Sequence, residues 1–430
     1  MKGGRAGIHM AQTLTATVAP PGHAFVARQP ILDQTRKLLG YELLLKPASP
    51  SDPHASALDR TSARVISEAL LSIGLDSLTG GKPAFVNISR RLLLEGIPDV
   101  LPAKNVVLQL AGDVEADSEV IEACTTLRQA GYAFAVDEFV LNPWTADLVP
   151  LSSYLKVGAS AIDAGTRAKL ITERAPGGPA LIATSVDTIG LFDALVGVGC
   201  PYFQGLFIGE PVVKRGRIVP GQQLTYLRLL RALNNPDLSV AALEELVKHD
   251  AALCHRILQT VNSAGFALRT TVRSIGDALL LLGRDTVRRW ASLWALASLN
   301  ERAHPEVVVM ATIRARCCEI LGGLIGGDEG GTDGFFLGLC SLLDTILERR
   351  MSEVLVDLPL SDETKHALLG ADSTGRRLLD CVIAYERGKW DEAVSAARRL
   401  GLDPLRLPKA YADALRWSKE LDQQRATSAA

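Results

Sequence analysis

The sequence predicts an α/β barrel followed by an all-helical domain, and three observations support this fold class. Short apolar runs of strand length alternate with segments of helical length from about residue 24 to residue 209. Eight such runs in succession are typical of a closed barrel of the TIM type, with parallel strands inside and helices outside. After about residue 222, strand patterns nearly vanish and Leu- and Ala-rich helical periodicity takes over. An open doubly wound sheet is the alternative for the first domain.

The eight apolar runs define the predicted strands, with one departure from a regular barrel. The first two runs are separated only by the segment ILDQTRK, which is too short for a right-handed helical crossover. We therefore expect these two strands to pair antiparallel, as a hairpin. The predicted strands cover residues 24–30, 38–46, 84–89, 105–110, 132–139, 154–158, 180–186 and 202–209.

The chain of 430 residues divides into three predicted segments. Residues 1–22 have the composition of a flexible tail, residues 23–222 form the barrel domain, and residues 223–425 form the helical domain. The second domain begins with the segment NNPDLSVAALEELVKHD, in which turn-forming residues precede a helical pattern. Such a change of pattern marks a domain boundary better than length alone.

Composition and charge exclude several classes of function. The net charge is −2, so the chain lacks the basic excess of a general nucleic-acid-binding protein. The sequence contains no run of eighteen apolar residues, so no membrane-spanning helix is predicted. The seven cysteines are scattered without CxxC spacing. This pattern indicates reduced, buried thiols in a cytoplasmic protein rather than disulfides or a zinc site.

Polar residues lie within or at the end of nearly every predicted strand. In barrels of this type the chemistry lies at the carboxyl ends of the strands, so these side chains converge on one mouth. As a set they indicate a ligand pocket rather than isolated polar strand ends. The set comprises Glu42, Asn87, Gln109, Asp137, Glu138, Lys156, Thr184, Asp187 and Gln204.

The first domain resembles the EAL domain over about residues 22–215, and six ordered motifs carry the resemblance. They are RQPILDQTRKLLGYELLLK, FVNIS, VVLQL, FAVDEF, YLKVG and YFQGLFIGEP. That family is a modified TIM barrel with one antiparallel strand, which agrees with the expected hairpin. The resemblance implies hydrolysis of cyclic di-GMP by two divalent cations, which activate a water and neutralise phosphate charge. Hard cations of this kind require several carboxylate oxygens.

The resemblance assigns ligand-contacting roles to ten positions of this chain. Glu42 matches the glutamate of the signature EAL tripeptide, and Asn87 matches a metal-binding asparagine. Lys156 matches the catalytic-site lysine, and Asp137 and Glu138 stand where the family has two aspartates. The residual metal candidates are Glu42, Asn87, Asp137 and Glu138. The ten implied pocket residues are Gln29, Glu42, Leu44, Lys46, Asn87, Gln109, Asp137, Glu138, Lys156 and Gln204.

Five departures from the family pattern weaken the implied metal site. Gln109, Gly158 and Thr184 each stand where the family has a carboxylate. Lys46 replaces an arginine that would hold a phosphate through two parallel hydrogen bonds, and FVLN at 139–142 replaces the Gly-rich loop FGTG. With three carboxylates missing, we expect no phosphodiesterase activity and no metal cofactor beyond residual Mg²⁺. An active metal-dependent phosphodiesterase is the alternative.

The second domain resembles the HDOD domain over about residues 225–395, most specifically in VNSAGF and SIGDALLLLG. This helical module is related to HD phosphohydrolases but usually lacks their metal ligands. His249 and Asp250 form no set with other His and Asp residues. Ser341 and Leu342 stand where an HD enzyme has its His-Asp pair. The segment AYERGKW at 384–390 is either a docking surface or an ordinary helix end.

The order of the two domains resembles the YuxH-type EAL–HDOD bacterial signalling proteins. This resemblance implies a non-enzymatic signal-transduction protein linked to cyclic di-GMP, with a degenerate EAL barrel and an HDOD output module. The expected partners are an unidentified signalling protein at the HDOD domain and cyclic di-GMP at the barrel. A homodimer is a further expectation, and neither a membrane nor nucleic acid is expected as a partner.

Overall fold

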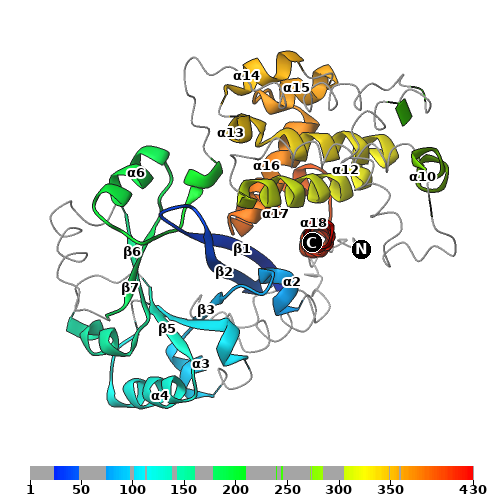
Figure 1. Cartoon of the computed structure of the whole chain (residues 1–430). Helices are drawn as coiled ribbons and strands as arrows, with labels where there is room; N and C mark the ends of the chain where they lie inside the picture. The colour runs from blue at the N-terminus through cyan, green and yellow to red at the C-terminus, as the bar shows by residue number, and fades with distance from the viewer. Residues whose placement is uncertain are drawn as a thin grey trace, which may run out of the picture.

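A barrel and a group of helices lie side by side, and the first two strands lie between them (Figure 1). The structure is a computed structural model, and it describes residues 24–47, 74–96, 101–111, 114–137, 143–159, 178–209, 239, 244–245, 272, 274–283, 305–347, 349–357 and 360–429. The predicted tail 1–22, the boundary near residue 222 and the pair His249 and Asp250 lie outside these residues.

Eight strands close the barrel in the order of the sequence. β1 pairs antiparallel with β2 and β8, and every other neighbouring pair is parallel. The barrel with one antiparallel strand is therefore confirmed, and the open sheet is wrong. The strands are β1 (Ala24–Asp33), β2 (Leu38–Pro47), β3 (Ala84–Ile88), β4 (Val106–Leu110), β5 (Ala133–Val136), β6 (Tyr154–Gly158), β7 (Ala180–Thr184) and β8 (Tyr202–Phe203).

A tight turn joins β1 to β2 and makes the first strand antiparallel. Oδ1 of Asp33 accepts hydrogen bonds from the backbone N–H groups of Thr35 (2.8 Å) and Lys37 (2.9 Å). Arg36 completes the reversal with a positive φ of 62°. Because an aspartate turn of this kind reverses the chain within a few residues, no helix can cross over between the two strands.

The barrel interior is built in layers, because side chains two residues apart along a strand share a face. One layer is apolar and buried, and consists of Ile31, Phe85, Val107, Ala135 and Ile182. Two residues further along the parallel strands stand the polar positions Asn87, Gln109, Asp137 and Thr184. The strands therefore carry a sealed apolar layer and, toward their carboxyl ends, a polar mouth.

Short helices cover the outside of the barrel, and three of the four α-helices described there begin at a side-chain cap. Oγ of Ser89 accepts a hydrogen bond from the N–H of Leu92 (3.3 Å), and Oδ1 of Asp117 accepts one from Val120 (2.9 Å). Such caps satisfy N–H groups that the first helical turn leaves unpaired. The helices are α2 (Leu75–Thr79), α3 (Arg90–Leu94), α4 (Ser118–Gln129) and α6 (Ile189–Gly197), with 3₁₀ turns η2 (Ala103–Asn105), η3 (Pro143–Leu151) and η4 (Leu206–Gly209).

The second half is helical throughout its described residues, as the sequence predicts. α12 packs against α16 and α18, and α16 and α18 also contact β1. Gly334 and Gly338, near the end of α12, lie against the backbone of Cys318 and Arg314 in its first half, where a Cβ would not fit. The helices are α10 (Ile275–Leu282), α12 (Pro305–Cys340), α13 (Leu343–Leu347), α14 (Met351–Val354), α15 (Asp362–Leu368), α16 (Thr374–Glu386), α17 (Trp390–Arg399) and α18 (Arg406–Ala429), with η6 (Leu355–Asp357).

The six cysteines that the structure describes are buried thiols, as predicted. Burial raises the pKa of Cys124 to about 12 and that of Cys381 to about 11, so both are protonated at neutral pH. Cys254 lies outside the described residues. The reduced, structural role expected for these residues therefore fits their surroundings.

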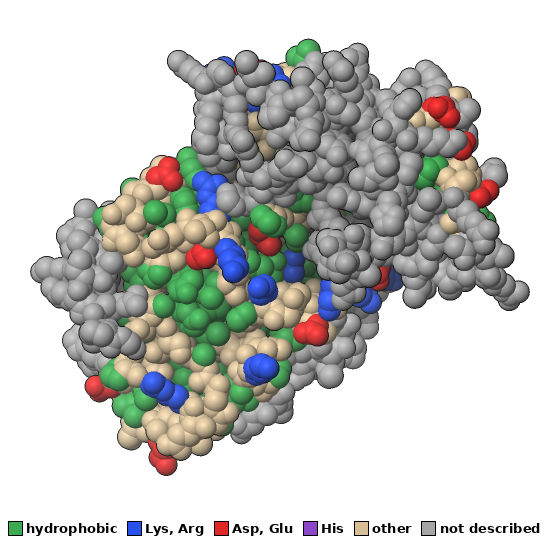
Figure 2. Space-filling model, viewed as in Figure 1, with side chains coloured by type: hydrophobic (Ala, Val, Ile, Leu, Met, Phe, Trp, Pro, Cys, Tyr) green, Lys and Arg blue, Asp and Glu red, His purple; other side chains and the backbone are tan. Residues whose placement is uncertain are grey.

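The surface turned to the viewer in Figure 2 carries no patch of a single charge sign on the described barrel residues. Hydrophobic side chains gather near the centre of the barrel in this view, and cationic and acidic side chains are interspersed around them. Among the helices that can be described, none combines the length and the hydropathy needed to span a bilayer.

Candidate functional site

The polar mouth of the barrel forms one connected hydrogen-bond network. Glu42 on β2 lies at its middle, and each neighbouring side chain comes from a different strand or from the residue that follows it. This convergence was predicted from the position of polar residues at strand ends. The network brings together seven of the ten implied pocket residues: Gln29, Glu42, Asn87, Gln109, Asp137, Lys156 and Gln204. Glu138 lies outside the described residues.

A buried ion pair anchors the network. Nζ of Lys156 lies 2.7 Å from Oε2 of Glu42, and the two side chains are only 2% and 9% exposed. Burial alone would raise the pKa of Glu42, but the Lys156 ammonium and hydrogen bonds from Lys156, Gln204 and Gln109 hold it below its usual value. Lys156 also lies 3.8 Å from Oδ1 of Asp137. Glu42 is therefore an ionised carboxylate at neutral pH, and its charge is already paired.

The carboxamide of Gln109 occupies the centre of the oxygen atoms around it. Its Nε2 donates to Oε1 of Glu42 (3.0 Å), Oδ1 of Asn87 (2.7 Å) and Oδ2 of Asp137 (2.7 Å). Its Oε1 accepts from Nζ of Lys156 (3.0 Å), and the residue is fully buried. An amide nitrogen carries two N–H donors, so the three oxygens share two hydrogens, and they meet a donor at this point rather than a cation.

The described oxygen atoms do not fit the two-metal chemistry that the EAL resemblance implies. One oxygen each from Glu42, Asn87 and Asp137 surrounds the amide nitrogen of Gln109. A divalent cation needs oxygen acceptors around it, whereas this nitrogen is a hydrogen-bond donor. Gly158 and Thr184 are paired neighbours at the ends of β6 and β7 and bring no carboxylate to that side. No group of three or more His, Cys, Asp and Glu side chains suited to a metal occurs within the described residues.

Gln204 links the barrel centre to the first strand. Its Nε2 donates to Oε2 of Glu42 (2.5 Å) and to Oε1 of Gln29 (2.9 Å). Its own Oε1 is buried and accepts no hydrogen bond within the described part of the chain. A buried acceptor of this kind calls for a donor from water or from a ligand. Gln29 and Gln204 therefore form a polar bridge where β1 and β8 face each other.

Two implied pocket residues lie at the rim of the mouth and face the helical half. Leu44 packs under the turn between α16 and α17, where a Cβ on Gly388 would lie 2.6 Å from Cδ1 of Leu44. Nζ of Lys46 lies 2.9 Å from Oδ1 of Asp391, and the side chains are 41% and 97% exposed. Exposed ion pairs are weak, so this contact is easily exchanged for another anion. Their ligand-binding roles stay predictions.

The AYERGKW segment docks on the barrel of its own chain. The hydroxyl of Tyr385 accepts a hydrogen bond from the backbone N–H of Val26 (3.2 Å). The ring of Phe25 lies 6.0 Å from that of Tyr385 and 5.7 Å from that of Trp390. The segment spans the end of α16 and the start of α17, as the helix-end interpretation expects, and its aromatic rings pack on β1 of the same chain. Docking on another protein stays a prediction. No local pattern indicates β1 as the contact, because it lies more than 350 residues away in the chain.

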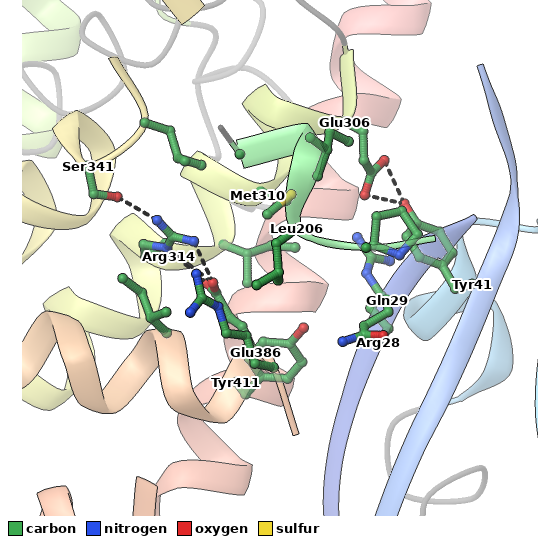
Figure 3. Close-up of a pocket in the computed structure, with 18 of the residues that line it drawn as sticks. Arg28, Gln29, Tyr41, Leu206, Glu306, Met310, Arg314, Ser341, Glu386 and Tyr411 are labelled. Carbon is green, nitrogen blue, oxygen red and sulfur yellow. Dashed lines mark hydrogen bonds and ion pairs between the residues drawn. The ribbon is translucent and has the colours of Figure 1, made fainter. Parts of the chain in front are cut away.

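In the helical half, Ser341 contributes to a buried ion pair, at the position that the sequence resemblance matches to the His-Asp pair of an HD enzyme. Oγ of Ser341 accepts from Nη1 of Arg314 (3.0 Å), and Nη2 of Arg314 lies 2.7 Å from Oε2 of Glu386 (Figure 3). Burial alone would lower the pKa of Arg314, but the Glu386 carboxylate raises it above its usual value. The sequence analysis missed this pair, because its partners stand on α12 and α16 without any motif.

Comparison with known proteins extends this description. Residues 219–343 match the HDOD domain family. The chain is 29% identical over 405 residues to the uncharacterized protein YuxH of Bacillus subtilis, a match that covers 92% of this chain and 98% of YuxH. It is 27% identical over 402 residues to CdgJ of Vibrio cholerae, a protein named as a cyclic di-GMP phosphodiesterase, and the match covers 93% of each chain.

Among solved structures, BlrP1 of Klebsiella pneumoniae in complex with calcium and cyclic di-GMP is similar to part of this chain. The TM-score is 0.37 and the identity 19%, over 44% of this chain and 57% of that one. The barrel description rests instead on the strand order of the chain itself. The resemblance to YuxH-type EAL–HDOD proteins is confirmed by similarity along nearly the whole chain, and the HDOD part by its family match.

Proposed function

We propose that this chain is a cyclic di-GMP signalling protein whose barrel binds the nucleotide without hydrolysing it. The similarity to CdgJ over 93% of the chain supports the link to cyclic di-GMP. The HDOD match supports a role of the second half in contacting another protein. The extensive contact between the two halves supports a route by which the barrel state affects the helices.

One observation carries the non-enzymatic part of the proposal, namely the position of Gln109. Its amide nitrogen lies within 2.7 to 3.0 Å of one oxygen each from Glu42, Asn87 and Asp137. Moving this amide aside would leave buried polar groups unpaired, at a cost of about 1–3 kcal/mol for each group. The mouth therefore favours its own internal hydrogen bonds over a cation.

The charges of the described mouth support the same conclusion. Metal-assisted hydrolysis needs cations that activate a water, and carboxylates that hold those cations. Glu42 and Asp137 bring two negative charges, and the ammonium of Lys156 already neutralises one of them at 2.7 Å. Two divalent cations would add four positive charges to this set. Binding through hydrogen bonds suits these residues better than two-metal hydrolysis.

A metal-dependent phosphodiesterase is the second candidate function, and the similarity to CdgJ favours it. This activity would require the side chain of Gln109 to leave the centre of the network. Glu42, Asn87 and Asp137, together with Glu138, would then hold a single Mg²⁺. Such a rearrangement makes activity depend on the residue at position 109, which gives the two candidates different outcomes in one experiment.

The experiment incubates the full chain with cyclic di-GMP and Mg²⁺ or Mn²⁺ and measures linear product by chromatography. We expect no turnover, together with binding by calorimetry that is the same with and without the metal. Turnover that Glu42→Gln removes would show that the barrel is an enzyme. Absence of both turnover and binding would reject the nucleotide link and leave a role in protein contact alone.

A substitution at position 109 sharpens this test. Gln109→Glu replaces the donor nitrogen at the centre by a second acceptor oxygen, so we expect cyclic di-GMP binding to become metal-dependent. The control is Gln129→Glu, which adds the same charge at an exposed position of α4. Equal behaviour of the two variants would contradict the central role given to Gln109.

The partner of the helical half is proposed to be a signalling protein, and a homodimer and a cytoplasmic location stay predictions. A pull-down that compares the full chain with and without cyclic di-GMP tests whether partner binding depends on the nucleotide. Size-exclusion chromatography with light scattering tests the dimer.

A further inference from the structure

A cavity of about 390 Å³ lies between the barrel and the helices, at the place where β1 and β8 separate. β1 pairs with β8 only through Leu32 and Asp33, so the two strands have parted before Gln29 is reached. Both halves of the chain supply its walls, which Figure 3 shows in close-up. This volume is within the usual range for small-molecule sites, and such sites occur preferentially between domains.

The acidic side chains that line the cavity are largely committed to protein partners. Glu386 pairs with the buried Arg314, and both carboxylate oxygens of Glu306 accept from the hydroxyl of Tyr41 at 2.9 Å. Oδ1 of Asp187 accepts from the backbone N–H of Leu206 (3.3 Å). Asp187 lies at the exposed rim, so the acidic side chains in the interior of this wall are the two already bound to protein partners, among the residues described.

Two side chains that line the cavity, in contrast, have hydrogen-bond donors without a protein acceptor among the described residues. Oε1 of Gln29 is occupied by Gln204, but within the described residues Nε2 of Gln29 donates to no protein group. The guanidinium of Arg387 also lines the cavity and makes no hydrogen bond or ion pair to the part of the chain that is described. A guanidinium and an amide together offer several N–H donors for an oxyanion.

Apolar side chains from both halves make up much of the remaining wall. Met310, Ile313 and Ile383 face the cavity from the helices, and Leu206 and Ile208 face it from the barrel. In Figure 3, Leu206 and Met310 lie between the Arg314–Glu386 pair and the Tyr41–Glu306 pair. A ligand that fills this space therefore needs an apolar body as well as acceptor atoms.

From these walls we infer that the junction cavity is a second ligand site, which takes a small organic oxyanion with an apolar body. The phosphate or carboxylate group of the ligand contacts Arg387 and Gln29, and its body packs against Met310, Ile383 and Leu206. Because the walls come from both halves, a bound ligand stabilises their contact. Through Gln29 it is connected to Gln204 and then to Glu42, at the centre of the barrel mouth.

The experiment uses the full chain and phenyl phosphate as the probe, with binding followed by calorimetry. We expect one molecule to bind per chain. Inorganic phosphate, which lacks the body, and phenol, which lacks the charge, should each bind at least tenfold more weakly. No binding of phenyl phosphate would reject the site, and equal affinity for inorganic phosphate would reject the role of the apolar wall.

Substitutions locate the site without depending on cyclic di-GMP. Arg387→Ala removes an exposed side chain, so the protein should fold, and we expect at least a tenfold loss of affinity for phenyl phosphate. The control is Arg398→Ala, which removes the same charge from an exposed position of α17 away from the cavity. Equal loss in both variants would show attraction by net charge alone and would overturn the assignment.

Discussion

Among the described residues, each half of the chain contains an ion pair in which both side chains are largely buried, and the two pairs differ in what surrounds them. Lys156 and Glu42 lie 2.7 Å apart in the barrel mouth, among amide side chains from several strands. Arg314 and Glu386 lie 2.7 Å apart between two helices, with one hydroxyl as an additional partner. The first pair lies in a polar network at the barrel mouth, whereas the second joins α12 to α16.

This difference separates a polar network from a single cross-helix contact. In the barrel, side chains from several strands meet, and Gln109 supplies a donor at the centre. In the helices, Arg314 and Glu386 have only Ser341 as an additional hydrogen-bond partner within the described residues. The barrel network therefore has more polar partners to lose than the helical pair.

The largest expected effect is on the barrel pair. Glu42→Ala leaves the ammonium of Lys156 buried without its carboxylate, and it also removes the acceptor of Gln109 and Gln204. Loss of one partner of a buried pair destabilises a protein by about 3–5 kcal/mol, and we expect the upper end of this range. Urea unfolding measures the loss. The double variant Glu42→Leu with Lys156→Met should recover much of it, and failure to recover would point to the amides instead.

A slightly smaller effect is expected for the helical pair. Glu386→Ala strands the guanidinium of Arg314, which keeps only the hydroxyl of Ser341, so we expect a loss near about 3 kcal/mol. The control is Asp372→Ala, which breaks an exposed ion pair with Arg377 and should leave stability nearly unchanged. Equal effects of the two substitutions would show that the buried pair of Arg314 and Glu386 contributes no more to stability than an exposed pair.

The pH dependence of the free energy of unfolding tests the barrel pair. The pKa of Glu42 is lowered in the folded state, so its ionised form contributes stability above the usual glutamate pKa. That stability is lost as pH falls through the lowered value. We expect the stability difference between wild type and Glu42→Gln to be constant above about pH 5 and to shrink at lower pH. Chemical unfolding between pH 7 and pH 3 measures it, and a constant difference throughout would contradict the assigned shift.

The sequence predicts the barrel mouth well because strand periodicity and strand ends are local patterns. Glu42, Asn87 and Lys156 converge as expected, since the carboxyl ends of barrel strands meet in one place. Gln29, on the antiparallel strand β1, was expected from the EAL resemblance alone. The role of Gln109 is different. Its identity shows a missing carboxylate, but only the packing of three strands places its nitrogen among the acceptors of its neighbours.

The contact between the two halves shows where sequence reasoning stops. Tyr385 and Trp390 are conspicuous in the sequence, yet their partner Phe25 lies far away on β1. The pair Arg314 and Glu386 joins two helices across 72 positions. Pairings of this kind depend on how two domains dock, and a single sequence carries no periodic signal for that geometry.

The smallest expected effect concerns the exposed pair at the rim of the mouth. Asp391 holds the ammonium of Lys46 at 2.9 Å, at the position where the EAL resemblance places a phosphate contact. Asp391→Asn should leave stability unchanged within error, but it frees Lys46 for the nucleotide. If the barrel binds cyclic di-GMP as proposed, the affinity should rise about two- to fivefold, the strength of an exposed ion pair. Calorimetry at fixed ionic strength measures this affinity.

The control Glu392→Gln removes the same charge from a neighbour that pairs with Lys389. An equal rise in both variants would indicate a general charge effect rather than competition for Lys46.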